Sequence, residues 1–350
     1  MMIRIITYNR SVNYGALLQA YALKESIKKY VEVELLNYNN KFVEKKESVK
    51  LLSKSFFKNI LRTLQFRKKY KRSHAFIKAM ASEKIYQREN LIVENFSNDK
   101  IIVGSDQVWN YNCSGSDTTF LLDWCEKAKK YSYAASFGVS ELTKNQIPVF
   151  KESLSKFRYI SVRERTGQAI CKEQLNLDAE IVLDPTLLIT KEEWKKRFNI
   201  EDKDNQYILV YSFSKNKEFI ETVKYISKLT GLPIYNISIS VKDFFGDKVI
   251  KNAGPKEWLE LFYNATFIVT DSFHGTAFSV NFNKPFYVFA KNAKASRIVD
   301  LLDVLGLQNR LNPVSTDINL KMEIDYNSVN EKLEIERTKS IAFIEKIIND

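Results

Sequence analysis

Short apolar runs alternate along this chain with segments whose apolar residues recur at helical spacing. Such runs, bounded by turn residues and separated by helices, are typical of βαβ units in a doubly wound α/β sheet. The predicted strands of the first half cover residues 3–8, 33–36, 101–104, 130–133, 159–162 and 181–183. A second series covers 207–211, 234–237, 267–270 and 285–288, and helices are predicted at 16–30, 217–229, 255–263, 275–281 and 328–348.

The second series of strands restarts the architecture of the first, which predicts two domains. A length of 350 residues suits two hydrophobic cores better than one. The polar stretch 190–206 is the expected boundary, because Asp184-Pro185 ends the preceding strand and little after it can be buried. We expect the two domains to face each other across a cleft at the carboxyl ends of their strands, where ligands of such folds bind. The predicted parts are 1–190 with a basic helical insert at about 41–96, then 205–320, then a C-terminal helix at 326–350.

The composition is that of a folded protein. Hydrophobic residues make up 45% of the chain and aromatic residues 13%, which excludes a disordered or low-complexity chain. The first apolar run meets polar residues almost at once, so it predicts a strand and not a signal peptide. No later run approaches the roughly 18 apolar residues needed to span a bilayer. We therefore expect a cytoplasmic protein.

The three cysteines do not indicate a disulfide framework or a metal site. Cys113, Cys125 and Cys171 are odd in number, show no Cys-x-x-Cys spacing and have no histidine nearby in sequence. We interpret them as reduced packing residues, and we predict no metal.

The net charge of +12 comes mainly from one segment. Residues 41–72 contain twelve basic and two acidic residues, so 12 − 2 = +10 of the charge lies there. Its apolar residues recur at helical spacing and predict a basic amphipathic helix. That helix either packs on the first domain or docks on an anionic membrane surface; nucleic acid is not an expected partner, because no recognition module accompanies the charge. The apolar stripe is Leu52, Phe56, Ile60, Leu61 and Leu64.

Polar residues follow two predicted strands of the first half. Asn13 and Gly15 form a turn into a helix, whose N-terminus attracts an anion. Ser105 and Asp106 follow the strand at 101–104, where Asp106 could accept a proton or bind a sugar hydroxyl. Trp109 offers an apolar face to a pyranose ring. The plainer interpretation is that Asn13 and Asp106 only cap helices.

Arg163 and Arg165 follow the predicted strand at 159–162. A guanidinium is well matched to carboxylate and phosphate groups, which it binds through two hydrogen bonds. We predict that this pair binds an anionic ligand. The alternative is a surface ion pair between Arg163 and Glu164.

The strand at 267–270 opens through Asp271-Ser272-Phe273-His274-Gly275 into an apolar helix. A histidine at this place can act as a general acid or base near neutral pH. Ser272, Gly275, Thr276 and the helix N-terminus could hold an anion. Arg297 could fold back toward this loop. The plainer alternative is a packing histidine.

Taken in order, these motifs resemble those of the polysaccharide pyruvyl transferase family. The resemblance runs from about residue 1 to residue 310 and rests on the number and order of motifs. The motifs are NYGALLQAYAL at 13–23, GSDQVWN at 104–110, SVRE at 161–164, LDPT at 183–186 and DSFHGT at 271–276.

The resemblance implies a GT-B-like pair of Rossmann-like domains. It also implies transfer of the pyruvyl group of phosphoenolpyruvate onto two sugar hydroxyls as a ketal during synthesis of cell-surface polysaccharide, without a cofactor. His274 and Arg163 would act on the donor, and Asp106 would orient or deprotonate the acceptor, a sugar or lipid-linked oligosaccharide. The chain departs from the family at Ser272, where members often carry arginine; Arg165 or Arg297 would have to replace it. A location at the inner face of the cell membrane would suit such an acceptor.

A GT-B glycosyltransferase that uses a nucleotide sugar is the main alternative. The same fold, helix N-terminus and arginines would serve a diphosphate equally well. Residue patterns alone do not separate the two donors.

Overall fold

The chain forms two compact α/β units in this computed structural model. The first unit comprises Met1–Lys54, Ser73–Leu188 and Ile335–Asp350; the second comprises Ser55–Arg72 and Ile189–Glu334. The structure describes residues 2–45, 56–239, 243, 245–290, 296–313, 318 and 323–350, leaving out the side chains of 56–63 and 65.

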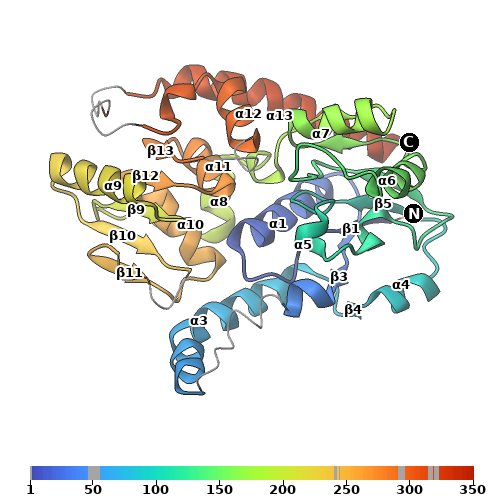
Figure 1. Cartoon of the computed structure of the whole chain (residues 1–350), viewed down its shortest axis with the longest axis horizontal. Coiled ribbons are helices and arrows are strands. Elements are labelled where there is room, and N and C mark those ends of the chain that lie inside the picture. The colour runs from blue at the N-terminus through green and yellow to red at the C-terminus, as the bar shows by residue number, and fades with distance from the viewer. Residues whose placement is uncertain are drawn as a thin grey trace. The chain divides into compact units, whose positions relative to one another are not determined.

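The first unit contains a four-stranded parallel sheet of order β2-β1-β5-β6, of which Figure 1 labels β1 and β5. Its strands are β1 (Ile3–Ile6), β2 (Val33–Leu35), β5 (Lys100–Val103) and β6 (Lys129–Ser132). Isolated bridges connect Tyr131 to Tyr159 and Ala135 to Val162. The sheet thereby continues toward a parallel pair, β7 (Ser161–Val162) and β8 (Glu180–Ile181). A separate parallel pair joins β3 (Asn37–Tyr38) and β4 (Ile85–Tyr86).

Both faces of the first sheet are buried, which explains why its strands read as continuous apolar runs. Ile5 of β1 and Ile102 of β5 contribute to one core, whereas Ile101 and Val103 contribute to the other. This alternation is the two-residue period of a strand. The helices of this unit include α1 (Tyr14–Lys28), α4 (Arg88–Val93), α5 (Tyr111–Ser114), α6 (Gln146–Leu154) and α7 (Arg165–Ala169).

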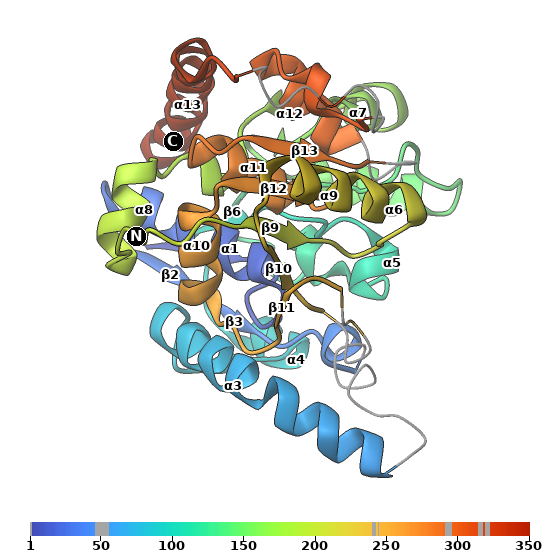
Figure 2. The same cartoon turned by 90° about the vertical axis from the view of Figure 1, so that its left-hand side faces the viewer.

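The second unit contains a five-stranded parallel sheet of order β11-β10-β9-β12-β13 (Figure 2). The strands are β9 (Ile208–Tyr211), β10 (Ile234–Ile237), β11 (Lys248–Ile250), β12 (Phe267–Thr270) and β13 (Phe286–Val288). The helices include α8 (Lys191–Phe198), α9 (Lys217–Thr230), α10 (Pro255–Asn264), α11 (Phe273–Asn281) and α12 (Ser296–Leu305).

The stretch 190–206, expected to be a polar boundary, begins with a helix. Thr190 caps α8: its hydroxyl accepts a hydrogen bond from the backbone N–H of Glu193, and the Glu193 carboxylate accepts one from the backbone N–H of Thr190. Trp194 and Phe198 lie four residues apart and are both buried. The helix is therefore part of the second unit and not a linker.

The C-terminal helix α13 (Tyr326–Asn349) begins in the second unit and ends in the first. Phe343, Ile344 and Ile347 enter the core of the first unit. The buried ammonium of Lys100 donates to the carbonyl oxygens of Ile347 and Ile348 at 2.9 and 2.7 Å. These bonds satisfy carbonyls that the last turn of any helix leaves without intrahelical partners.

The basic insert is only partly described. It includes α3 (Phe56–Met80), but Leu52 and the side chains of Phe56, Ile60 and Leu61 lie outside the described part of the chain. Leu64 is 58% exposed, so it does not pack. Arg72 contacts Glu257 at 3.1 Å and the carbonyl of Asn252. Ser55–Arg72 is grouped with the second unit, whereas the rest of α3, from Ser73 onward, is grouped with the first.

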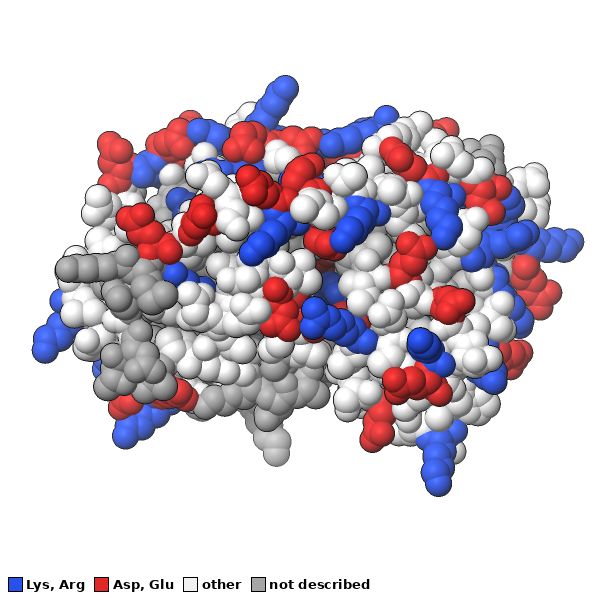
Figure 3. Space-filling view, turned by 90° about the horizontal axis from the view of Figure 1, so that it is seen from above, with Lys and Arg blue, Asp and Glu red and all other residues white. Residues whose placement is uncertain are grey.

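Charges of both signs are mixed on the face drawn in Figure 3, where Lys and Arg side chains are interspersed with Asp and Glu. Among the described residues, no helix is both long and apolar enough to cross a membrane.

Candidate functional site

The end of β5 positions Asp106 in the first unit. The chain passes close to β1 at Gly104, where a Cβ would lie only 3.0 Å from the Cβ of Thr7. Asp106 then adopts a φ of +77°, a left-handed conformation that costs free energy in a residue with a side chain. Such strain persists only where the surroundings impose it, and it is common at functional sites. Its carboxylate is 14% exposed and accepts a hydrogen bond from the backbone N–H of Gln107.

Arg163 lies beside Asp106 but is buried among carboxylates. Its side chain is 2% exposed, and Nη1 lies 2.6 Å from Oδ2 of Asp184. Nη2 lies 3.5 Å from Oδ1 of Asp106, and Nε lies 3.8 Å from Oε2 of Glu164. Burial alone lowers the pKa of Arg163, but the three carboxylates outweigh burial and the net shift is upward. The guanidinium is therefore a permanent internal cation.

Arg163 forms a buried ion cluster with Asp106, Glu164 and Asp184, and Asp184 is its centre. Besides Arg163, its carboxylate accepts hydrogen bonds from the hydroxyl of Ser105 and from the backbone N–H and hydroxyl of Thr186. The structure corrects two expectations. Arg163 is not an accessible clamp for a ligand, and the fully buried hydroxyl of Ser105 serves Asp184 instead of a substrate.

Trp109 is also a core residue, contrary to the expectation of a sugar platform. It is 1% exposed, and its indole N–H donates to the carbonyl of Phe120 at 3.0 Å. Its ring packs against Phe137 with the centroids 5.0 Å apart. A pyranose could stack on this ring only if the core opened.

The turn before α1 and the start of α7 carry the other predicted residues of the first unit. Asn13 caps α1, since its side-chain oxygen accepts from the N–H of Gly15 at 3.0 Å. That bond already uses one of the amides expected to attract an anion. Arg165 begins α7 and is exposed, unlike Arg163.

The loop after β12 is held by a network of hydrogen bonds in the second unit. Asp271 accepts from the hydroxyl of Ser212 and from the backbone N–H groups of Phe213 and Ser214, at 2.7–2.8 Å. These bonds tie the end of β12 to the end of β9.

Ser272 is the N-cap of α11. Its hydroxyl accepts from the N–H of Gly275 at 3.3 Å, and its carbonyl accepts from the hydroxyl of Thr276 at 3.0 Å. Gly275 passes so close to Thr270 that a Cβ would lie 2.3 Å from its Oγ1. The side chains of Ser272 and Thr276 are thus hydrogen-bonded within the helix terminus, whereas they were predicted to bind a ligand.

His274 lies in the first turn of α11 and is 7% exposed. Its ring contacts Phe273 edge to face with the centroids 5.3 Å apart. The guanidinium of Arg297 lies 5.8 Å from the centroid of the same Phe273 ring. The predicted return of Arg297 to the His274 loop therefore occurs, through Phe273.

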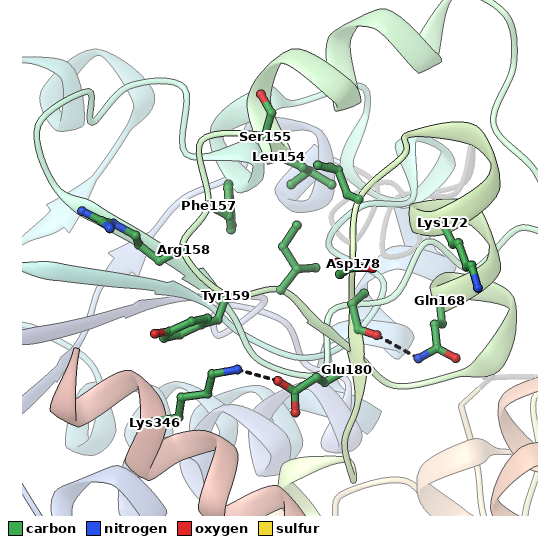
Figure 4. A pocket seen from close by; sticks show the side chains of 13 residues that line it. Leu154, Ser155, Phe157, Arg158, Tyr159, Gln168, Lys172, Asp178, Glu180 and Lys346 are labelled. Atoms are coloured by element: carbon green, nitrogen blue, oxygen red, sulfur yellow. Dashed lines mark hydrogen bonds and ion pairs between the residues drawn. The ribbon is translucent and has the colours of Figure 1, made fainter.

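A pocket of about 470 Å³ lies elsewhere in the first unit (Figure 4). Its lining includes Phe157 and Ile160, which precede β7, whereas Arg163 follows β7. At its rim Lys346 pairs with Glu180 at 2.8 Å. The pocket thus lies at the opposite end of β7 from Arg163.

The described residues include no group of three or more His, Cys, Asp or Glu side chains that could hold a metal ion.

Asp184 and Asp271 were not predicted as functional residues, although each stands directly after a predicted strand and within one of the motifs. Their position directly after a strand was the signal by which they could have been found.

One family model matches most of the chain, and the matched region contains all five motifs. The model of the polysaccharide pyruvyl transferase family matches residues 13–292. The chain belongs to this family. The matched region includes the buried ion cluster around Asp184 and the His274 loop. No curated protein sequence matches the chain.

Several solved structures show a weak likeness to the pyruvyl transferase family chain. A UDP-GlcNAc 2-epimerase from Methanocaldococcus jannaschii is 13% identical, with a TM-score of 0.47 over 96% of this chain and 93% of its own. A UDP-N-acetylglucosamine 2-epimerase from Rickettsia bellii is 11% identical, with a TM-score of 0.43 over 99% and 98%. The trehalose-6-phosphate synthase OtsA is 9% identical, with a TM-score of 0.44 over 99% and 95%. Likenesses at this level assign no substrate to the chain.

Proposed function

We propose that this transferase moves the pyruvyl group of phosphoenolpyruvate onto two hydroxyls of a sugar, as a cyclic ketal. The acceptor would be a sugar or lipid-linked oligosaccharide in the synthesis of cell-surface polysaccharide. The proposal rests on family membership together with one observation, the position of His274 in the first turn of α11 with Arg297 on the neighbouring phenyl ring.

The reaction requires a proton donor and binding groups for two anions. The methylene carbon of phosphoenolpyruvate gains one proton, two hydroxyl oxygens bond to C2, and the bond from C2 to the phosphate oxygen breaks. One hydroxyl proton replaces the proton given to the methylene carbon, and the other leaves with inorganic phosphate. His274 would donate the first proton, because imidazole can act as an acid near neutral pH.

The anionic groups of the donor would bind at the same helix terminus. The N-terminus of α11 carries a partial positive charge, and Arg297 adds a full one. Arg297 would thus replace the arginine that members of the family often carry at the position of Ser272.

Asp106 is the candidate base of the first unit. Among the described residues, its Oδ1 contacts Arg163 and the N–H of Gln107, while Oδ2 has no hydrogen-bond partner. Arg163 and Asp184 would act as positioning residues that hold this carboxylate in its strained conformation. Asp106→Asn should then lower turnover without weakening the binding of phosphoenolpyruvate.

A pair of histidine variants tests the proposed acid. The chain has two histidines, and His74 is exposed on α3, so His74→Gln is a matched control for His274→Gln. Loss of a general acid typically lowers the rate about 10²- to 10⁴-fold. We expect the rate of phosphate release from phosphoenolpyruvate to fall by this factor in His274→Gln and to stay unchanged in His74→Gln. Circular dichroism should show that both variants are folded. Near-normal turnover of His274→Gln would remove the proposed role.

Thermal stabilisation tests the donor separately. A ligand that binds only the native state raises the melting temperature. Phosphoenolpyruvate should raise it, and UDP- and GDP-sugars should not. The reverse result would favour a glycosyltransferase.

A further inference from the structure

Three lysine side chains converge on one tyrosine ring in the second unit. The Nζ atoms of Lys191, Lys195 and Lys284 lie 5.5, 5.4 and 5.6 Å from the centroid of the Tyr263 ring. Two of the lysines come from α8, Tyr263 comes from α10, and Lys284 precedes β13. α8 and α10 lie side by side in both ribbon views (Figures 1 and 2). We call these three side chains the lysine cluster.

Among the described residues, Asp202 is the carboxylate that acts on all three lysines of the cluster, so one negative charge faces three positive ones. Asp202 pairs with Lys195 at 2.6 Å and is itself exposed. Within the described part of the chain, neither Lys191 nor Lys284 has an ion-pair partner. Lys191 is also the first residue of α8, where the positive end of the helix dipole disfavours a cation. The aromatic ring can offset only part of this repulsion.

Lys284 shows the effect of this crowding. Burial, followed by the neighbouring charge of Lys191, lowers the pKa of Lys284 to about 8, while Asp202 opposes the shift. A lysine that is this strongly desolvated and repelled has a lower free energy when an anion approaches.

We propose that the lysine cluster binds a phosphate monoester group. A dianion supplies the two negative charges that Lys191 and Lys284 lack, and lysine binds phosphate as a point charge. The site lies at the amino end of β13, whereas His274 follows the carboxyl end of β12, so the two occupy opposite edges of a parallel sheet. The proposal does not depend on the pyruvyl transfer reaction.

The reactivity of Lys284 tests the proposal directly. Trace labelling with acetic anhydride at pH 8, read by mass spectrometry, measures the fraction of each amine that is neutral. A bound anion that raises the pKa of Lys284 by about one unit would slow its labelling about fivefold at this pH. The probes are glycerol 3-phosphate in solution and phosphatidylcholine vesicles containing phosphatidic acid, each against sodium chloride of equal ionic strength.

The two probes carry the same headgroup, so they separate a soluble ligand from a lipid surface. Protection by glycerol 3-phosphate indicates a soluble phosphate ester, and protection by vesicles alone indicates a membrane lipid. Either result supports the site. No protection beyond that given by sodium chloride overturns it.

Two variants test whether the anion that protects Lys284 binds at the lysine cluster. Lys191→Met should abolish the protection of Lys284, and it should also slow labelling without ligand, because the loss of repulsion raises the pKa of Lys284. Lys217→Met, an exposed lysine on α9, is the matched control and should leave protection unchanged. If Lys191→Met is folded by circular dichroism and Lys284 is still protected, the ligand binds elsewhere and the proposal is wrong.

Discussion

Replacing Arg163 with Met should destabilise the first unit by about 3–5 kcal/mol. The guanidinium is the cation shared by Asp184 and Glu164, whose side chains are 0% and 1% exposed. Removing it takes away the positive charge that lies 2.6 Å from the carboxylate of Asp184 and 3.8 Å from that of Glu164. Breaking a buried pair by removing one partner typically costs this amount. For a unit of this size, the loss corresponds to a melting temperature lower by about 6–20 °C.

A second substitution separates charge from packing. Arg163→Met combined with Asp184→Asn removes one of the carboxylates, while the Asn side-chain oxygen can still accept from Thr186. We expect the double variant to be about 1–3 kcal/mol more stable than the single variant, the coupling typical of residues in one network.

The pH dependence of the single variant has a definite sign. Burial without a cation favours the neutral carboxyl, so the folded variant binds protons more readily than its unfolded chain. Its stability therefore rises relative to the wild type as the pH falls from 8 to 5.

Urea denaturation should be followed by hydrogen exchange and mass spectrometry on peptides of the first unit, because two units need not unfold together. Two results would show that Arg163 is not the essential counter-charge. One is a decrease of less than about 1 kcal/mol in the free energy of unfolding of Arg163→Met, and the other is a double variant no more stable than the single one.

Three further predictions follow from burial and close contacts. Burial raises the pKa of Cys125 and Cys171 to about 12, so only Cys113 should react with a disulfide reagent at pH 8, and rapid reaction of all three would contradict this. Gly275→Ala forces the neighbouring threonine of β12 to move, and it should cost about 1–3 kcal/mol in thermal unfolding; an unchanged melting temperature would contradict the close contact. Lys100→Met removes two hydrogen bonds to the last turn of α13; it should speed amide exchange there, and unchanged exchange would show that the bonds do not hold the helix end.

The main strands could be predicted from the sequence because they are buried on both faces. β9 and β12 are buried along their whole length, and a strand covered on both faces shows as an unbroken apolar run. The short strands β3, β4 and β11 were missed, since none of them contains more than two consecutive apolar residues. α8 was missed although its signals were present, a capping Thr190 with Glu193 and buried Trp194 and Phe198 at helical spacing.

The positions of the candidate residues were predictable, but their exposure was not. Parallel strands end at one edge of a sheet, so polar residues after strands gather there. The direction of each side chain beyond a strand end depends on contacts distant in sequence. Arg163 is buried because Asp184, 21 residues later, receives its guanidinium. Trp109 is buried because its indole N–H donates to the carbonyl of Phe120 and the ring of Phe137 packs against it.

Carboxylates at strand ends divide into two kinds in this chain, and the division gives a physical test for chemistry. Asp184 and Asp271 each accept at least three hydrogen bonds from neighbouring loops, so any proton they gained would break contacts that hold those loops. Asp106 combines a left-handed backbone, partial exposure and an oxygen without a hydrogen-bond partner among the described residues. Only a carboxylate of this second kind can take up a proton from a substrate without disrupting the fold. A position after a strand is common to all three carboxylates and does not distinguish them.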